Sequence, residues 1–250
     1  LFGHAEKSNW TFSNCTNEGT FTVTFADPGH QFHSLGGILA TGYGVFDNCV
    51  NKGKIMFNNS NGTKYRRTGG IVGCVGSDAG LGYTLRMTNC RNEATGNMTS
   101  PTMADYDLFY MGGIAGKVAG AFTLKNCINR GNLTAAVERD IAGIAVAGDN
   151  NAVFDGCENY GNITVVANHK TDKWRPIVAG IVAIENDKVT TITNCTFSNN
   201  VAKGPGGAFG LGAGDSNLNL NNTIAYGNEG NGKAQSYGQN ADVNGGGKVV

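Results

Sequence analysis

The chain has 250 residues, 39 of them glycine, with zero formal net charge and only 15% charged residues. The balanced charge argues against a nucleic-acid-binding protein, which needs excess Lys and Arg to neutralise phosphates, and a 40% hydrophobic content argues against disorder. The longest apolar stretch, Ile177 to Ile184, is far shorter than the roughly 20 residues that span a bilayer, so we expect no membrane-spanning segment. Because the chain starts with Leu, we expect it to be a processed or excised part of a longer protein.

Two short motifs alternate along the whole chain. The first is a strand-like run that ends in a cysteine, and five of the six cysteines follow an asparagine directly. These cysteines are Cys15, Cys49, Cys90, Cys127, Cys157 and Cys195, and a further copy, Leu220-Asn-Asn-Thr223, has threonine instead. The second is Gly-Gly-Ile or a close variant, beginning at Gly36, Gly69, Gly112, Ala142, Ala179 and Gly206. The cysteines are spaced by 34, 41, 37, 30 and 38 residues, which indicates a repeat of about 36 residues.

Each repeat is expected to contain about three short strands and no helix. Phe122 and Leu124 alternate with Thr123 and Lys125, which is strand periodicity. A second strand follows Gly131 and the Gly-Gly-Ile motif forms a third. One such unit cannot bury its apolar face, whereas stacked units share a continuous core.

The sequence therefore predicts an all-β fold, a right-handed parallel β-helix (solenoid) of about seven coils in a single domain, 1–250. The coils are expected near residues 10–42, 43–76, 83–119, 120–149, 151–187, 189–215 and 218–250. A β-propeller is the competing fold, but its blades have four strands, and the short strands with Gly and Asn corners favour the β-helix.

The asparagines and cysteines are expected to stack as ladders. The asparagine before each Cys falls on the inward parity of its strand, so we expect it at a left-handed corner, bonded to its equivalents in adjacent coils and inaccessible, as at Asn14 and Asn194. A second ladder is expected at the next corner, from Asn17, Asn51, Asn92, Asn129 and Asn159.

The cysteines are expected to be buried free thiols. Their number, seven including Cys74 outside the motif, is odd, and there is no Cys-x-x-Cys. Equivalent positions in adjacent coils are about 4.8 Å apart, whereas disulfide Cβ atoms need about 3.5–4.5 Å. A line of sulfurs also lacks the tetrahedral geometry of a zinc site. We therefore expect a structural Cys15–Cys195 column of small hydrophobic side chains, with no metal and no cofactor.

Two parts of the sequence resemble known repeat families. Gly112-Gly-Ile-Ala-Gly116 followed by Asn126-Cys-Ile-Asn-Arg-Gly131 resembles the GLUG-like repeats of large secreted surface proteins. Thr196-Phe-Ser-Asn-Asn200 with Gly206-Gly-Ala208 is similar to the repeats of polymorphic outer-membrane adhesins. Both resemblances imply right-handed β-helices at cell surfaces, and the regular Asn-Cys pair departs from both families.

The sequence offers little catalytic chemistry. We find no pair of carboxylates suited to glycoside hydrolysis and no recurring Asp cluster for Ca²⁺. His30-Gln-Phe-His33 is the only close histidine pair and has no accompanying Glu, so a polar loop is the simpler interpretation. We therefore expect a non-enzyme.

Long insertions before the Gly-Gly-Ile strands predict a binding edge. They span Ala26–Leu35, Asn58–Thr68, Thr99–Tyr110 and Ala167–Ile177. Aromatic residues and arginines suit protein or glycan recognition, and the candidates are Tyr65, Arg66, Arg67, Tyr106, Tyr110, Trp174 and Arg175. The best candidates for glycosylation among the Asn-x-Ser/Thr sequences are Asn58, Asn61 and Asn97.

These features predict a non-catalytic extracellular or cell-surface structural or adhesive module. Exposed strand edges at the ends of the stack suggest a homo-oligomer or an end-to-end filament, because a head-to-tail contact that does not close propagates. The alternative is a carbohydrate-binding or polysaccharide-degrading β-helix. An ice-binding surface is a third interpretation, but the sequence has no regular Thr-x-Thr ladder.

Overall fold

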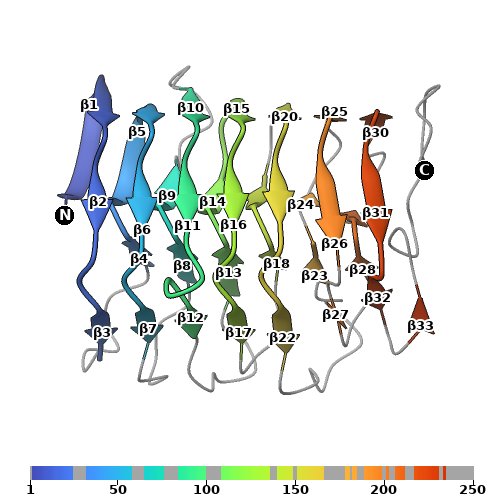
Figure 1. The fold of residues 1–250 in the computed structure, drawn as a ribbon. Helices are drawn as coiled ribbons and strands as arrows, with labels where there is room; N and C mark the ends of the chain where they lie inside the picture. The colour runs from blue at the N-terminus through green and yellow to red at the C-terminus, as the bar shows by residue number, and fades with distance from the viewer. Residues whose placement is uncertain are drawn as a thin grey trace.

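The computed structural model describes residues 2–24, 32–57, 65–75, 84–99, 108–135, 140–148, 151–165, 178–180, 182–184, 189–198, 201–202, 206–211, 217–230 and 233–234. This part of the chain is all-β and contains no helix. Its strands lie side by side in sequence order from the N-terminal to the C-terminal end of a long stack (Figure 1). Every strand pair is parallel except the last, β32–β33.

The largest sheet has 12 strands among the described residues and two halves that share β5. One half holds the strands that precede each Asn-Cys corner: β1 (Phe2–Ser13), β5 (Leu39–Asp47), β10 (Leu85–Thr88), β15 (Phe122–Lys125), β20 (Ala152–Asp155), β25 (Val189–Thr193) and β30 (Asn217–Asn221). The other half holds the strands that follow the Gly-Gly-Ile motif: β9 (Val72–Val75), β14 (Ala115–Val118), β19 (Ala145–Ala147), β24 (Val182–Ile184) and β29 (Gly210–Leu211).

Four smaller sheets complete the described fold. The seven-stranded sheet follows the cysteines: β2 (Thr16–Asn17), β6 (Val50–Asn51), β11 (Arg91–Asn92), β16 (Ile128–Asn129), β21 (Glu158–Asn159), β26 (Thr196–Ser198) and β31 (Ile224–Tyr226). The five-stranded sheet is β3 (Phe21–Val23), β7 (Ile55–Phe57), β12 (Met98–Thr99), β17 (Leu133–Ala135) and β22 (Ile163–Val165). The six-stranded sheet is β4 (Phe32–Gly36), β8 (Tyr65–Gly69), β13 (Leu108–Gly112), β18 (Asp140–Ala142), β23 (Val178–Ala179) and β28 (Gly206–Gly207). A three-stranded sheet has β27 (Val201–Ala202), β32 (Glu229–Gly230) and β33 (Lys233–Ala234).

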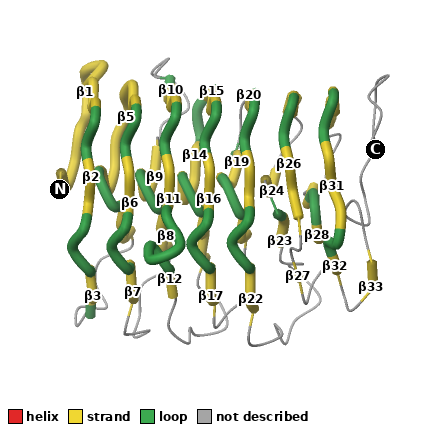
Figure 2. Tube along the Cα trace, viewed as in Figure 1, coloured by secondary structure: helices red, strands yellow, loops and turns green. Residues whose placement is uncertain are grey.

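One repeat passes through the sheets in a fixed order. The repeat containing Cys127 runs through β15, β16, β17, β18 and β19, so it has five strand segments where the sequence predicted three. The difference arises because segments of two or three residues, such as β16, are too short to show alternation but still pair with their neighbours above and below. Figure 2 shows this succession of short strands and loops along the stack.

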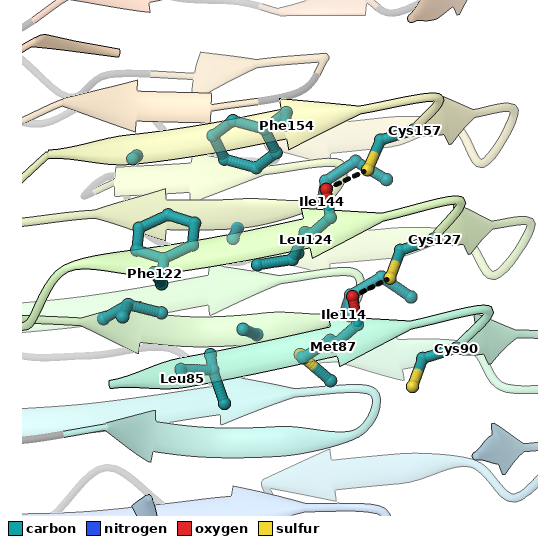
Figure 3. Packing of buried hydrophobic residues seen from close by; sticks show 14 of the residues in the cluster. Leu85, Met87, Cys90, Ile114, Phe122, Leu124, Cys127, Ile144, Phe154 and Cys157 are labelled. Carbon is teal, nitrogen blue, oxygen red and sulfur yellow. Dashed lines mark hydrogen bonds between the residues drawn. The ribbon is translucent and has the colours of Figure 1, made fainter. Parts of the chain in front are cut away.

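The register of the strand pairs places equivalent residues of successive repeats over one another. Phe46, Met87, Leu124, Phe154, Ile192 and Leu220 occupy one column of the 12-stranded sheet. All six are buried and belong to one apolar cluster, part of which Figure 3 shows. At the N-terminal end the ring of Phe12 stacks on that of Phe46, with centroids 4.7 Å apart. The shared interior predicted from the repeat is therefore present in the described residues.

The Gly-Gly-Ile motif allows very close approach of neighbouring repeats. A Cβ atom on Gly113 would overlap the carbonyl oxygen of Gly143 and the side-chain Cγ of Asn129. A Cβ atom on Gly143 or on Gly70 would overlap the corresponding atoms of the adjacent repeat. The second glycine of the motif is therefore required by contacts between repeats, not by a local turn alone.

Candidate functional site

The most regular polar feature of the described residues is a ladder of hydrogen-bonded asparagines. We call it the inner ladder, and it consists of Asn17, Asn51, Asn92, Asn129 and Asn159. Each Nδ2 donates to the Oδ1 of the next asparagine, from Asn17 to Asn51 (2.7 Å), Asn51 to Asn92 (2.8 Å), Asn92 to Asn129 (2.8 Å) and Asn129 to Asn159 (2.7 Å). The last four side chains are fully buried, and Asn17 is partly exposed. The structure thus brings together all five residues that the sequence placed at the second corner.

The amides of Asn17, Asn51, Asn129 and Asn159 also close the turns of their own repeats. The Nδ2 of Asn129 donates to the carbonyl of Gly131 (3.1 Å), and the N–H of Gly131 donates to the Oδ1 of Asn129 (3.2 Å). Together with the two ladder bonds, this satisfies both donors and both lone-pair directions of the Asn129 amide. The ladder ends at Asn159, because Phe197 occupies the next position in register.

The asparagines that precede the cysteines form an outer corner and do not point inward. Asn14, Asn48, Asn89, Asn126 and Asn194 all have a positive φ, between 51° and 54°, and all are exposed. The left-handed conformation was correctly predicted, but the inward orientation was wrong, because the left-handed residue interrupts the alternation of the strand. The expectation that Asn14 and Asn194 are inaccessible is wrong for the same reason.

Side-chain amides at the outer corner also form hydrogen bonds between repeats. The Nδ2 of Asn48 donates to the Oδ1 of Asn14 (2.8 Å), and that of Asn222 donates to the Oδ1 of Asn194 (2.7 Å). In the repeat of Cys157 the corner residue is Gly156, with φ 63°, and Asn194 donates instead to Asp155 (3.2 Å). The bonds of the outer corner run in the direction opposite to those of the inner ladder.

The motif cysteines are free thiols that point into the core. Cys49, Cys90, Cys127, Cys157 and Cys195 are buried and Cys15 is partly exposed. Figure 3 shows Cys90, Cys127 and Cys157 at matching places in successive repeats. The thiols of Cys49, Cys90, Cys127 and Cys157 donate to a carbonyl of the preceding repeat, for example Cys127 to Met87 (3.7 Å) and Cys157 to Leu124 (3.4 Å).

Thr223 reproduces the bonding of the cysteines that it replaces. Its Oγ1 donates to the carbonyl of Asn221 (3.0 Å) and to that of Ile192 in the preceding repeat (3.5 Å). Cys127 makes the same pair of contacts, with Lys125 (3.5 Å) and Met87. A small side chain with one donor is therefore what this position requires, whether the donor is a thiol or a hydroxyl.

Most of the buried thiols hold their protons. Burial raises the pKa of Cys127 and of Cys157 well above the ordinary value of 9.0. A hydrogen bond with Cys90, together with burial, raises the pKa of Cys49. Cys90 differs, because hydrogen bonds with Cys127 and Cys49 lower its pKa. Cys49, Cys127 and Cys157 are therefore neutral hydrogen-bond donors and not thiolate nucleophiles.

We expect the fold to lose stability at alkaline pH. Below pH 9 the thiols of Cys127 and Cys157 are protonated in both the folded and the unfolded chain, so their contribution to folding is fully present there. Above pH 9 these two thiols ionise only in the unfolded chain, and each of them lowers the free energy of unfolding by about 1.4 kcal/mol per pH unit until the folded pKa is reached. Urea unfolding at pH 8 and pH 10 measures this loss.

The matched control for this experiment is Cys127→Thr, because Thr223 shows that threonine can make the same bonds. We expect this variant to lose about 1.4 kcal/mol less than the parent chain between pH 8 and pH 10. Equal losses would show that Cys127 ionises as readily in the folded chain as in the unfolded one.

The predicted binding edge lies partly inside the protein. Arg66 and Arg67 belong to β8 and Tyr110 to β13, and all three side chains are buried, so their expected exposure is wrong. The strands of the six-stranded sheet begin earlier than the insertions suggested. The backbone of Tyr65 starts β8, while Tyr106, Trp174, Arg175, Asn58 and Asn61 lie outside the described residues.

Arg67 and Tyr110 join a polar cluster that the sequence did not predict. Ser34, Arg67, Tyr110 and Asp140 share one register position across β4, β8, β13 and β18. Cys74 and Lys117 share another in β9 and β14. The Nζ of Lys117 lies 4.2 Å from the ring centroid of Tyr110, a cation–π contact.

The cysteine of this cluster is Cys74, the one outside the repeated motif. Burial has the largest effect on its pKa and raises it, while the charges of Arg67 and Lys117 and hydrogen bonds with Arg67 and Ser34 lower it by less. A protonated, buried thiol is a poor nucleophile. The contact between Lys117 of β14 and Tyr110 of β13 joins two sheets. Contacts between sheets, which leave no periodic signal in the sequence, bring these residues together.

The sequence did not predict a third column of asparagines, which consists of Asn97, Asn132 and Asn162. The N–H of Asn132 donates to the Oδ1 of Asn97 (2.8 Å), and the N–H of Asn162 donates to the Oδ1 of Asn132 (3.0 Å). The spacings of 35 and 30 residues between these asparagines could have been found in the sequence. Asn97, a glycosylation candidate, is partly buried in this column, whereas Asn132 and Asn162 are exposed.

Among the described residues, no group of three or more His, Cys, Asp or Glu side chains is arranged to hold a metal ion. Nor does this part of the chain contain a helix long and apolar enough to cross a membrane.

No family model, no curated protein and no solved structure matches this chain.

Proposed function

We propose that the chain is a right-handed parallel β-helix that serves as a structural or adhesive module at the cell surface or outside the cell. The right-handed sense is supported by the strong preference of parallel β-connections for that hand. The surface location is supported by the resemblance of its motifs to repeats of secreted surface proteins.

The observation that carries this proposal is that the polar side chains recurring in each repeat form hydrogen bonds between repeats. The thiol of Cys157 and the amides of Asn129 and Asn159 are buried and bonded to the adjacent repeats. The chemistry that defines the repeat is thus used to hold repeats together. A stack joined in this way suits a rigid spacer, a segment of a surface filament or a scaffold for exposed loops.

Surface labelling tests this function. We expect antibodies raised against residues 1–250 to label intact source cells, and electron microscopy of the native material to show rods or filaments containing the chain. Labelling only after the cells are made permeable would contradict the proposed location. Compact particles without any elongated form would contradict the structural role.

A further inference from the structure

Two exposed tyrosines lie on the outer face of the seven-stranded sheet. Tyr160 follows β21 directly, and Tyr226 is the last residue of β31. Their side chains are 45% and 56% exposed, and Ile224, also on β31, is 49% exposed. Three large apolar side chains that contact solvent are therefore found on neighbouring repeats of one sheet.

The register of the sheet places both tyrosines in one column with Ser198. Ser198 pairs with Tyr226 between β26 and β31, which lie side by side in Figure 1. Asn159 pairs with Phe197 between β21 and β26, so the next residues, Tyr160 and Ser198, are level with each other. Phe197 and Asn159 are fully buried. Because side chains alternate along a strand, the column of Tyr160, Ser198 and Tyr226 is on the outward side.

The two tyrosines are two strand steps apart, which is about 10 Å. Ser198 occupies the step between them and is buried, so no large side chain stands between them in this column. Tyr160 has described repeats on both sides of it. Since both tyrosines face sideways from the stack, further repeats at either end of the chain would leave this face open.

Polar groups of balanced charge border the two tyrosines. Burial and a hydrogen bond with Glu158 raise the pKa of Tyr160, so its hydroxyl is protonated at neutral pH. Arg130, which is level with Tyr160, forms an ion pair with Glu93 (3.7 Å), and Glu93 also pairs with Arg91 (3.6 Å). These carboxylates and guanidinium groups can bond the hydroxyls of a ligand. Their opposite charges offset each other, which favours an uncharged ligand.

The size of this face distinguishes a glycan from a protein as its partner. Three side chains that are each about half exposed offer about 300 Å², whereas a stable protein interface buries about 800 Å² on each partner. A sugar needs much less area, because the C–H groups on one face of its ring pack on a single aromatic ring while its hydroxyls bond to polar groups beside it. In an extended β-linked chain every second sugar presents the same face, and the length of this disaccharide unit is close to the spacing of the two tyrosines.

We propose that Tyr160 and Tyr226 form a binding surface for an extended, uncharged, β-linked polysaccharide. One sugar packs on each tyrosine ring, and the sugar between them lies over Ser198. The polysaccharide chain runs along the stack, across the strands. This binding goes beyond the proposed structural function, because it gives one face of the stack a ligand of its own.

Soluble hexasaccharides of β-linked glucose, mannose, xylose and N-acetylglucosamine test the proposal, with binding measured by isothermal titration calorimetry. We expect at least one of them to bind the full chain with a Kd of about 1 mM or lower. Tyr160→Ala and Tyr226→Ala should each weaken this binding about tenfold, through loss of one stacking contact. Tyr226→Phe keeps the ring and should bind as the parent chain does. Val153→Ala, at an exposed apolar residue of the 12-stranded sheet, is the matched control and should also bind as the parent does.

Four results would overturn the proposal: no binding of any hexasaccharide at about 10 mM, equal binding by the parent and both alanine variants, tighter binding of the charged hexagalacturonate than of every uncharged hexasaccharide, or self-association of the chain that Tyr160→Ala abolishes. The last result would assign the face to a second copy of the chain. Circular dichroism of each variant checks that it folds as the parent does. Rods or filaments formed by a chain that binds no glycan would reject only this binding surface and leave the proposed structural function in place.

Discussion

Replacing Asn129 by alanine is expected to lower the free energy of unfolding by about 3–5 kcal/mol. The side chain is fully buried and bonds to Asn92, to Asn159 and twice to Gly131. Alanine leaves buried donors and acceptors on all three residues without a partner, and each such group costs about 1–3 kcal/mol. Urea unfolding followed by circular dichroism measures the change.

The matched control for Asn129→Ala is Asn126→Gly, at the outer corner of the same repeat. Asn126 is exposed, makes a longer bond of 3.4 Å to Asn89 and has a positive φ that glycine adopts readily. We expect Asn126→Gly to change stability by no more than about 1 kcal/mol. If the two variants lose the same amount, the inner ladder does not stabilise the stack in the way described.

Replacing Gly113 by alanine is expected to destabilise the chain by about 4 kcal/mol or more, or to prevent folding. The added methyl group would overlap the backbone oxygen of Gly143 and the side chain of Asn129, so neighbouring repeats would have to separate. Because the obstacle includes backbone, no change of side-chain rotamer relieves it. Thermal and urea unfolding of the purified variant measure the loss.

Gly3→Ala is the control for this substitution, since a Cβ at Gly3 would meet no atom within 4 Å. We expect its effect to be at most about 1 kcal/mol in either direction. A Gly113→Ala variant as stable as Gly3→Ala would show that the repeats are not packed as closely as the structure places them.

The repeat itself made much of the fold predictable. Regular spacing of the motif around Cys15, Cys49 and later cysteines predicts stacked units, and alternation around Leu124 predicts strands with one buried face. Because equivalent residues of parallel in-register strands must lie over one another, the position of Asn129 beneath Asn159 follows from the spacing alone. The replacement of cysteine by Thr223 likewise indicated a packing role.

The corners limited what the pattern could predict. Counting alternate residues from Phe122 and Leu124 places Asn126 inside, but one left-handed residue rotates the chain and turns its side chain to solvent. Asparagine tolerates that conformation, so its presence indicated the corner. The direction in which the side chain points depends on the corner geometry, which the residue type does not specify.

The burial of three residues of the predicted binding edge has a different reason. Arg66, Arg67 and Tyr110 are residue types that occur commonly in exposed recognition loops, and they follow long insertions. The strands β8 and β13 begin at Tyr65 and Leu108, which takes all three into the six-stranded sheet. Their burial depends on the neighbouring strands β9 and β14, and no local sequence pattern records that contact between sheets.

The anomalous scattering of sulfur tests the stacked arrangement most directly. In a crystal of the full chain, we expect six peaks, from Cys15, Cys49, Cys90, Cys127, Cys157 and Cys195, to form one line with steps of about 4.8 Å. If the sulfurs of these six cysteines were dispersed through the molecule, or joined in pairs at bonding distance, the result would contradict a stack in which each repeat covers the one before it.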